Sequence, residues 1–320
     1  MKNAFMHIIL AAALFATLEP VGKLISEDAP PALITAARFL LGGAVLLLPA
    51  AHAIKKEKLR ITAKILLKTA ALGVLAVCGA MVLLQQAVRM SASPAVVAIV
   101  FSANSVFSVL LARPILKEKI GKWHLAAFAL CMCGILAGAD LAGGVSAAPV
   151  LLAGLSAVVF SLYTVFGKKA MADIPGAVVT CFSFLFGGGA LMLAQAALGV
   201  DVWRYINAGT APSLLYLGIA VTGIGFWAYF KVLGQSSAFH ASLVFFIKPI
   251  LTPFAVWIIN GLAPGANIFA ALALVLAGSL IAAKRPMGRA GAASGGADQG
   301  GADQDRAEQC GADRGGAPMA

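Results

Sequence analysis

Long apolar segments alternate with short polar loops along most of the chain. Each segment approaches the twenty or so residues that a helix needs to cross a bilayer. Ten such segments occur, at residues 4–25, 32–53, 65–88, 93–112, 123–140, 148–167, 177–198, 213–233, 239–260 and 265–283. Lipid offers the backbone no hydrogen-bond partners, so spans that do not close into a barrel must be helices. The pattern therefore predicts an all-α integral membrane protein with ten transmembrane helices.

The first segment resembles a signal peptide at its start, where Lys2 precedes an apolar run. The run continues past Glu19 and Pro20 to Ile25, which is too long for a cleaved leader. We therefore expect this segment to remain as the first span.

Composition agrees with a bilayer environment. Of the 320 residues, 61% are hydrophobic and only 12% are charged, and the mean hydropathy is +0.93. A soluble domain is usually nearer half apolar and a quarter charged. The net charge of +11 does not indicate nucleic acid, because the cations lie in loops and form no basic face interleaved with aromatic residues. The cysteine spacing suggests neither a disulfide framework nor a metal site.

Lysine and arginine are concentrated in every second loop. The second, fourth and sixth loops hold Lys55, Lys56, Lys58, Arg60, Lys64, Arg113, Lys117, Lys119, Lys122, Lys168 and Lys169. The intervening loops are poor in cations, and the first contains Glu27 and Asp28. Loops rich in Lys and Arg stay in the cytoplasm. We therefore predict a multi-pass protein of the plasma (inner) membrane with both termini cytoplasmic.

The composition changes near residue 285. Residues 285–320 repeat Gly-Ala-Asp and contain no apolar run that would offset the entropy of ordering. We expect this segment to be a disordered cytoplasmic tail.

The two halves of the chain resemble each other at an offset near 145 residues. The matches include Phe15 with Phe160, Phe39 with Phe184, Gly42-Gly43 with Gly187-Gly188, and Gly73 with Gly218. They divide the chain into repeats at 1–144 and 145–284, each with five predicted spans. An odd number of spans makes the second repeat enter the membrane from the opposite side. Inverted repeats are typical of carriers that expose a central site to each side in turn.

These features, with several diffuse motifs, resemble the drug/metabolite transporter superfamily and its EamA-type family of ten-helix transporters. The motifs are RFLLGGAVLLL in the second span, SASPAVVAIVFSAN at the fourth, LKEK after it, and SSAFHASLVFFIKPILTP in the ninth. Pro249 matches the family's mid-helix proline and Glu118 its loop glutamate, whereas Ala103-Asn104 departs from the proline common there. The resemblance implies a carrier, commonly a secondary-active exporter of amino acids or similar metabolites.

Glu19 and Arg38 are ionisable residues inside adjacent predicted spans. Each lies six or seven residues from the outer end, so both would lie about 10 Å below the outer surface. Intramembrane charge is costly and marks a functional site by default. Two interpretations stay open: an ion pair that neutralises both residues, or a substrate site in which Arg38 binds a carboxylate and Glu19 receives an amine or a proton.

Lys248 is the third such residue, near the middle of the ninth span. Pro249 and Pro253 follow it and are expected to break the helix, and we predict hinges at Pro20, Pro249 and Pro253. Carriers build substrate sites from broken helices at the midplane. Lys248 would bind an anionic group, or alternatively pair with Glu19 or with freed carbonyls.

Ser102 and Asn104 occupy the middle of the fourth span, the repeat equivalent of the ninth. They would either hydrogen-bond substrate or join helices. With Glu19, Arg38 and Lys248 they form the predicted substrate site.

Taken together, these residues predict a secondary transporter of small metabolites that works by alternating access, with a bound substrate, possible proton coupling and no cofactor. The sequence contains no Walker motif, which argues against direct use of ATP. A channel or scaffold is the alternative, and an intramembrane enzyme is disfavoured because no catalytic motif is present.

Overall fold

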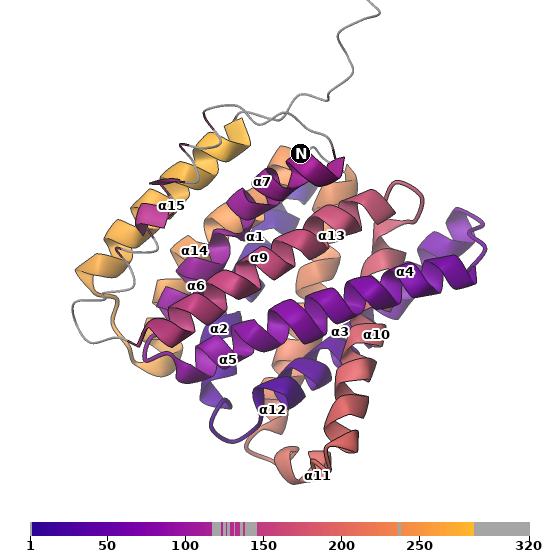
Figure 1. Cartoon of the computed structure of the whole chain (residues 1–320), viewed down its shortest axis with the longest axis horizontal. Coiled ribbons are helices and arrows are strands. Elements are labelled where there is room, and N and C mark those ends of the chain that lie inside the picture. Colours follow the sequence, from indigo (N-terminus) through magenta and orange to yellow (C-terminus); the bar gives the residue numbers. More distant parts are fainter. Residues whose placement is uncertain are drawn as a thin grey trace, which may run out of the picture.

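The computed structural model describes residues 2–116, 123, 126, 129–130, 132–134, 137, 146–235 and 238–284. All regular elements among these residues are helical, as the apolar pattern predicted (Figure 1). The first half contains α1 (Lys2–Ala16), α2 (Leu18–Leu24), α3 (Pro31–Lys56), α4 (Ala63–Gly73), η1 (Val74–Met81), α5 (Val82–Met90), α6 (Pro94–Ser102) and α7 (Asn104–Leu116). The second contains α9 (Ala147–Ala170), α10 (Gly176–Ala197), α11 (Val202–Tyr205), α12 (Ala211–Leu215), η3 (Tyr216–Ile224), α13 (Gly225–Gln235), α14 (Ala238–Asn260) and α15 (Ala266–Lys284). The η elements are π-helices.

Six helical segments are long and apolar enough to cross a membrane. They are Phe5–Leu24, Pro31–Lys56, Ala63–Met90, Ala147–Ala170, Gly176–Ala197 and Ala211–Tyr229. Shorter apolar helices at Pro94–Ser108, Ile247–Asn260 and Ala266–Gly278 fall within the predicted fourth, ninth and tenth spans. The multi-pass membrane fold is therefore confirmed. The predicted span at 123–140 lies mostly outside the described residues, as does the predicted tail at 285–320, so the total of ten stays a prediction.

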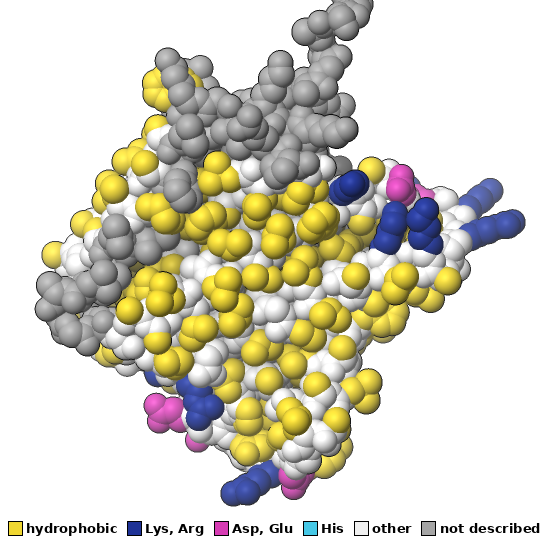
Figure 2. Space-filling model, viewed as in Figure 1, with side chains coloured by type: hydrophobic (Ala, Val, Ile, Leu, Met, Phe, Trp, Pro, Cys, Tyr) yellow, Lys and Arg dark blue, Asp and Glu magenta, His cyan; other side chains and the backbone are white. Residues whose placement is uncertain are grey.

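The outer surface of the helical body is largely apolar, and charged side chains gather at its ends (Figure 2). Large hydrophobic residues such as Leu48, Leu67 and Ile258 are exposed there. In water such a surface would aggregate, whereas lipid solvates it.

Among the described residues, two of the predicted spans contain a helix break, at Thr17 and at Ala103. Pro20 has no N–H to donate to the carbonyl of Ala16, and α1 ends at Ala16. Thr17 stabilises the turn that follows, because its Oγ1 donates to Leu14 O at 2.8 Å. The second interruption is at Ala103, between α6 and α7.

The expected break in the ninth span is absent, since α14 continues as one helix past Pro249 and Pro253. Thr252, between the two prolines, donates its hydroxyl to Lys248 O at 2.9 Å. Packing against neighbouring helices lets membrane helices tolerate proline. Pro249 and Pro253 therefore do not interrupt the helix here, and their predicted hinge role stays a prediction.

The two halves make reciprocal contacts through their glycines. Gly42 approaches the carbonyl of Gly218, and Gly187 approaches the carbonyl of Gly73. Adding 145 to Gly42 and Gly73 gives Gly187 and Gly218, so each contact is the other with the halves exchanged. A side chain at these positions would collide with the facing helix, which is why glycine is needed.

The contacts between whole helices are reciprocal in the same way. α3 packs on α10, where the rings of Phe39 and Phe184 meet edge to face with centroids 4.6 Å apart. α3 also packs on η3, while α10 packs on α4 and η1. Likewise α1 packs on α13 and α14, and α9 packs on α5, α6 and α7. Each half thus completes the packing of the other, and residues of the first and ninth spans become neighbours.

Candidate functional site

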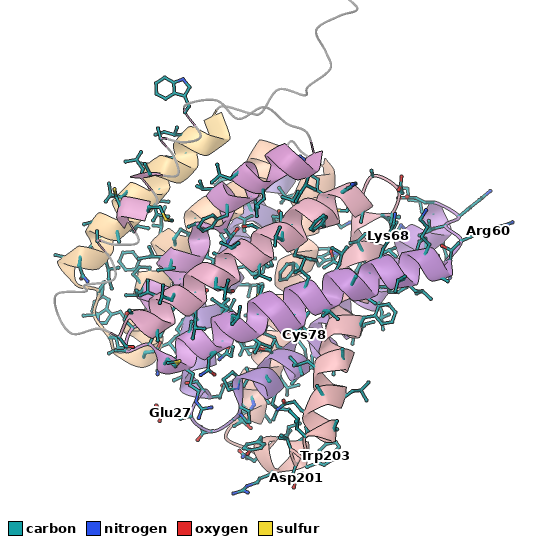
Figure 3. The ribbon with its side chains drawn as sticks, in the orientation of Figure 1. Glu27, Arg60, Lys68, Cys78, Asp201 and Trp203 are labelled. Atoms are coloured by element: carbon teal, nitrogen blue, oxygen red, sulfur yellow. The ribbon has the colours of Figure 1, made fainter. Side chains whose placement is uncertain are left out.

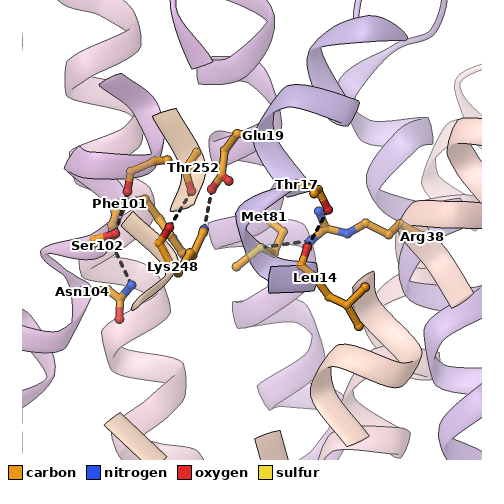
Figure 4. A network of polar contacts seen from close by, with 11 residues as sticks. Leu14, Thr17, Glu19, Arg38, Met81, Phe101, Ser102, Asn104, Lys248 and Thr252 are labelled. Atoms are coloured by element: carbon orange, nitrogen blue, oxygen red, sulfur yellow. Dashed lines mark hydrogen bonds and ion pairs between the residues drawn. The ribbon is translucent and has the colours of Figure 1, made fainter. Parts of the chain in front are cut away.

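A buried ion pair joins the two halves of the chain. Lys248 Nζ on α14 lies 2.6 Å from Glu19 Oε1 on α2 (Figure 4). The Glu19 side chain is fully buried and that of Lys248 is 4% exposed. The structure therefore brings together two of the predicted site residues that are 229 positions apart in sequence. It adopts the pairing of Lys248 with Glu19 that the sequence left open.

The local backbone explains why Glu19 points at α14. Glu19 lies in the first turn of α2, which begins only after the chain has turned at Thr17. The positive end of a helix dipole favours an acid at this position. Asn260, at the end of α14, donates to Pro20 O at 3.2 Å and ties the two elements together.

Lys248 has a second electrostatic contact that the sequence did not predict. Its Nζ lies 5.3 Å from the centre of the Phe101 ring on α6. The negative face of an aromatic ring attracts an ammonium group, more strongly where water is excluded. Phe101 could have been suspected only from its place beside Ser102.

Arg38 is buried nearby on α3 but has no carboxylate within ion-pair distance among the described residues. Its Nη2 lies 3.4 Å from Met81 Sδ, a weak acceptor, and its guanidinium carbon lies 4.6 Å from the Phe39 ring centre. The direct pairing of Glu19 with Arg38, one of the two interpretations above, is therefore not adopted in this state.

The resulting cluster is short of negative charge. It holds one carboxylate, Glu19, against two cations, Arg38 and Lys248. Glu19 Oε2 and Arg38 Nε are buried and have no hydrogen-bond partner among the described residues. Buried polar atoms are nearly always paired, and those without a partner indicate a ligand, an ion or a water that completes the site. An anion placed here would neutralise the excess positive charge and accept from Arg38 Nε, whereas Glu19 Oε2 is itself an acceptor and needs a donor.

Ser102 and Asn104 lie at the break between α6 and α7, both buried. Ser102 Oγ donates to Ala98 O at 2.7 Å, and Asn104 Nδ2 donates to Phe101 O at 2.7 Å. Ser161 on α9 donates to Asn104 O at 2.8 Å. These bonds hold the interrupted backbone, so a structural role for both residues is observed and their contact with substrate stays a prediction.

Another contact missed by the sequence lies beside the first break. Thr17 Oγ1 and the Tyr216 hydroxyl are 2.9 Å apart and link the turn between α1 and α2 to η3. Gln85 on α5 donates to Gly22 O on α2 at 3.1 Å. Neither partner could be identified without knowing which helices pack together.

The EamA-like transporter family matches the chain twice, over residues 3–137 and 147–283. An uncharacterized transporter of Clostridium kluyveri is 32% identical over 290 residues, covering 88% of this chain and 93% of the relative. The uncharacterized transporter YvbV of Bacillus subtilis is 26% identical over 242 residues, covering 73% of this chain and 76% of the relative. One protein of known crystal structure superposes with a TM-score of 0.63 at 22% identity, covering 88% of this chain and 96% of the other. That structural likeness concerns the fold alone.

Proposed function

The chain belongs to the EamA-like transporter family, as its motifs suggested, and we propose that it is a secondary carrier of small metabolites that works by alternating access. Its substrate carries an anionic group, as amino acids and similar metabolites do. The family resemblance favours export, and the loop charges favour a plasma membrane with both termini in the cytoplasm.

The ion pair between Lys248 and Glu19 is the observation that carries this proposal. It joins the first half of the chain to the second at a point sealed from solvent. In an open channel the charges that line the path would be in contact with water. A sealed cluster of charge between two halves is what a carrier needs in its occluded state, when the site faces neither side of the membrane.

The cluster supports an anionic substrate group. A carboxylate entering between Arg38 and Lys248 would give the excess positive charge a partner and would accept from Arg38 Nε. Arginine suits this role because its planar fork binds both oxygens of a carboxylate. A substrate carboxylate would also compete with Glu19 for Lys248, and a proton taken up by Glu19 would release Lys248 to the substrate. That competition provides a route for proton coupling.

Reciprocal packing supports the inverted arrangement of the halves. Arg60 lies in the loop after the second predicted span, and Trp203 lies in the equivalent loop after the seventh. These two loops lie at different ends of the molecule: Asp201 and Glu27 are at the same end as Trp203, and Lys68 is at the same end as Arg60 (Figure 3). Two halves related in this way would exchange conformations when the site changes the side it faces. Thr17 and Pro20, between α1 and α2, provide one place for the chain to bend.

Reconstituted vesicles provide the test. Wild-type protein should show counterflow of a carboxylate-bearing metabolite, with trapped substrate accelerating uptake of labelled substrate, and a channel should not. Glu19→Gln and Lys248→Ala should each abolish flux while the protein still inserts. Glu27→Gln and Lys231→Ala are matched controls, because both residues are exposed. These two variants should transport normally. Normal flux in both site variants would refute the proposed site, and leak without counterflow would refute the carrier.

A further inference from the structure

A groove unrelated to the central charges runs between α4 and α9. Its volume is about 520 Å³. Leu72, Leu75 and Phe166 form apolar walls, and Lys68, Lys169 and Asp173 surround the mouth. The groove opens at the end of the molecule where α4 begins, the end at which Lys68 and Arg60 are seen in Figure 3.

The mouth of the groove carries more positive than negative charge. Lys68 Nζ lies 3.9 Å from Asp173 Oδ2, which is the outer limit of an ion pair, and the Asp173 side chain is 74% exposed. An exposed pair at that distance contributes little and is easily exchanged for another anion. Among the described residues Lys169 has no ion-pair partner at all. Two lysines therefore face one weakly held carboxylate.

The groove also has a direction relative to the membrane. From Lys68 to Leu75 the helix rises about 10 Å, at 1.5 Å per residue. Leu67 and Val74, on the same stretch of helix, are exposed large hydrophobic residues. The groove therefore starts at the level of lipid headgroups and descends along a surface that acyl chains cover. A lipid with its phosphate at the mouth would place its glycerol and first methylenes against the apolar walls.

We propose that this groove is a binding site for one anionic phospholipid of the adjacent leaflet. The lipid phosphate lies between Lys68 and Lys169 in place of the Asp173 carboxylate, and an acyl chain lies between Leu75 and Phe166. Basic pockets between transmembrane helices recognise anionic headgroups in this way. A free phosphate would fit the mouth but would leave the apolar walls uncovered. This proposal depends only on membrane residence and not on transport.

Native mass spectrometry of the full chain in neutral detergent, with phosphatidylglycerol or phosphatidylcholine added, tests the site. Wild-type protein should retain phosphatidylglycerol in preference to phosphatidylcholine. The variant Lys68→Ala/Lys169→Ala should bind it about thirtyfold more weakly, roughly fivefold for each lysine near the surface. The matched control is Lys55→Ala/Lys56→Ala, which removes the same charge from exposed positions of the neighbouring α3 terminus.

Two further arms separate lipid from free anion. Ala71→Trp fills the groove without changing its charge, because Ala71 lines it, and should also abolish retention. Glycerol 3-phosphate, the headgroup without chains, should fail to displace the lipid. Lys68→Gln/Lys169→Gln repeats the test if the alanine variant is not monodisperse. Equal retention by wild type and both lysine variants would overturn the site. Equal loss in the control, retention by Ala71→Trp, or displacement by glycerol 3-phosphate would overturn the assignment to lipid.

Discussion

Removing the charges of the central cluster one at a time should reveal how they neutralise one another. Glu19→Gln leaves the two cations Arg38 and Lys248 buried with no anion. Lys248→Met leaves Glu19 with Arg38 as the remaining buried cation of the cluster. The two variants delete opposite ends of the same ion pair, yet only the first leaves the cluster entirely positive. We therefore expect Glu19→Gln to be the more destabilising substitution.

The magnitudes follow from the burial of the pair. Removing one partner of a buried ion pair costs about 3–5 kcal/mol of unfolding free energy, because the remaining charge has lost its counter-ion. Glu19→Gln should lie in that range, since both cations remain desolvated. Lys248→Met should cost less than about 3 kcal/mol, since Arg38 can still neutralise Glu19. The double variant Glu19→Gln/Lys248→Met lacks the ion pair altogether. A double-mutant cycle built from the wild type, the two single variants and this double variant should give a coupling energy between Glu19 and Lys248 of about 2–3 kcal/mol.

Reversible unfolding of the purified protein in mixed micelles, followed by circular dichroism, measures these differences, and counterflow on the same preparations measures transport. The double variant should be more stable than the sum of the two single effects predicts, but it should not transport. Additive effects within about 0.5 kcal/mol would refute the pair. Equal or reversed costs of the two single variants would refute the role assigned to Arg38.

Two other predictions concern packing and topology. Gly73→Ala should destabilise the fold by about 1–3 kcal/mol, because a Cβ there would collide with the Ser183 carbonyl. Gly154→Ala should be neutral or stabilising, because nothing lies within 4 Å of a Cβ at that position. Unfolding in micelles compares the two variants, and equal costs would contradict the close packing of α4 on α10. In a cysteine-free background, an impermeant thiol reagent applied to intact cells should label Trp203→Cys but not Arg60→Cys. The loop charges place these two residues on opposite sides of the membrane. Labelling of both variants, or of Arg60→Cys alone, would contradict the inverted topology.

The charges of the cluster are not repeated at the equivalent positions of the other half: Lys248, in the second half, corresponds to Ala103 in the first. At the offset of 145, Glu19 corresponds to Thr164 and Arg38 to Ser183, neither of which is ionisable. The glycines and phenylalanines that pack the halves are shared, so the framework is symmetric while the charged site is not. The buried charge, drawn from both halves, is confined to a single cluster, so its desolvation cost arises at only one place.

The sequence by itself determined the features that depend on period, composition and loop charge. Membrane residence, helical class and the internal repeat follow from these properties alone, because a bilayer imposes a fixed span length and forbids unpaired backbone. Glu19, Arg38 and Lys248 could be singled out for the same reason, since ionisable residues are rare in apolar segments.

Only the tertiary structure decided which partners these residues have. Glu19 pairs with Lys248, 229 residues away, and not with Arg38 on the next span, because α14 packs on α1 and α2. It also placed the helix breaks at Thr17 and Ala103 and left α14 continuous. The type of each residue determines the free-energy cost of placing its side chain in lipid. The contacts that offset this cost form between helices that are distant in sequence.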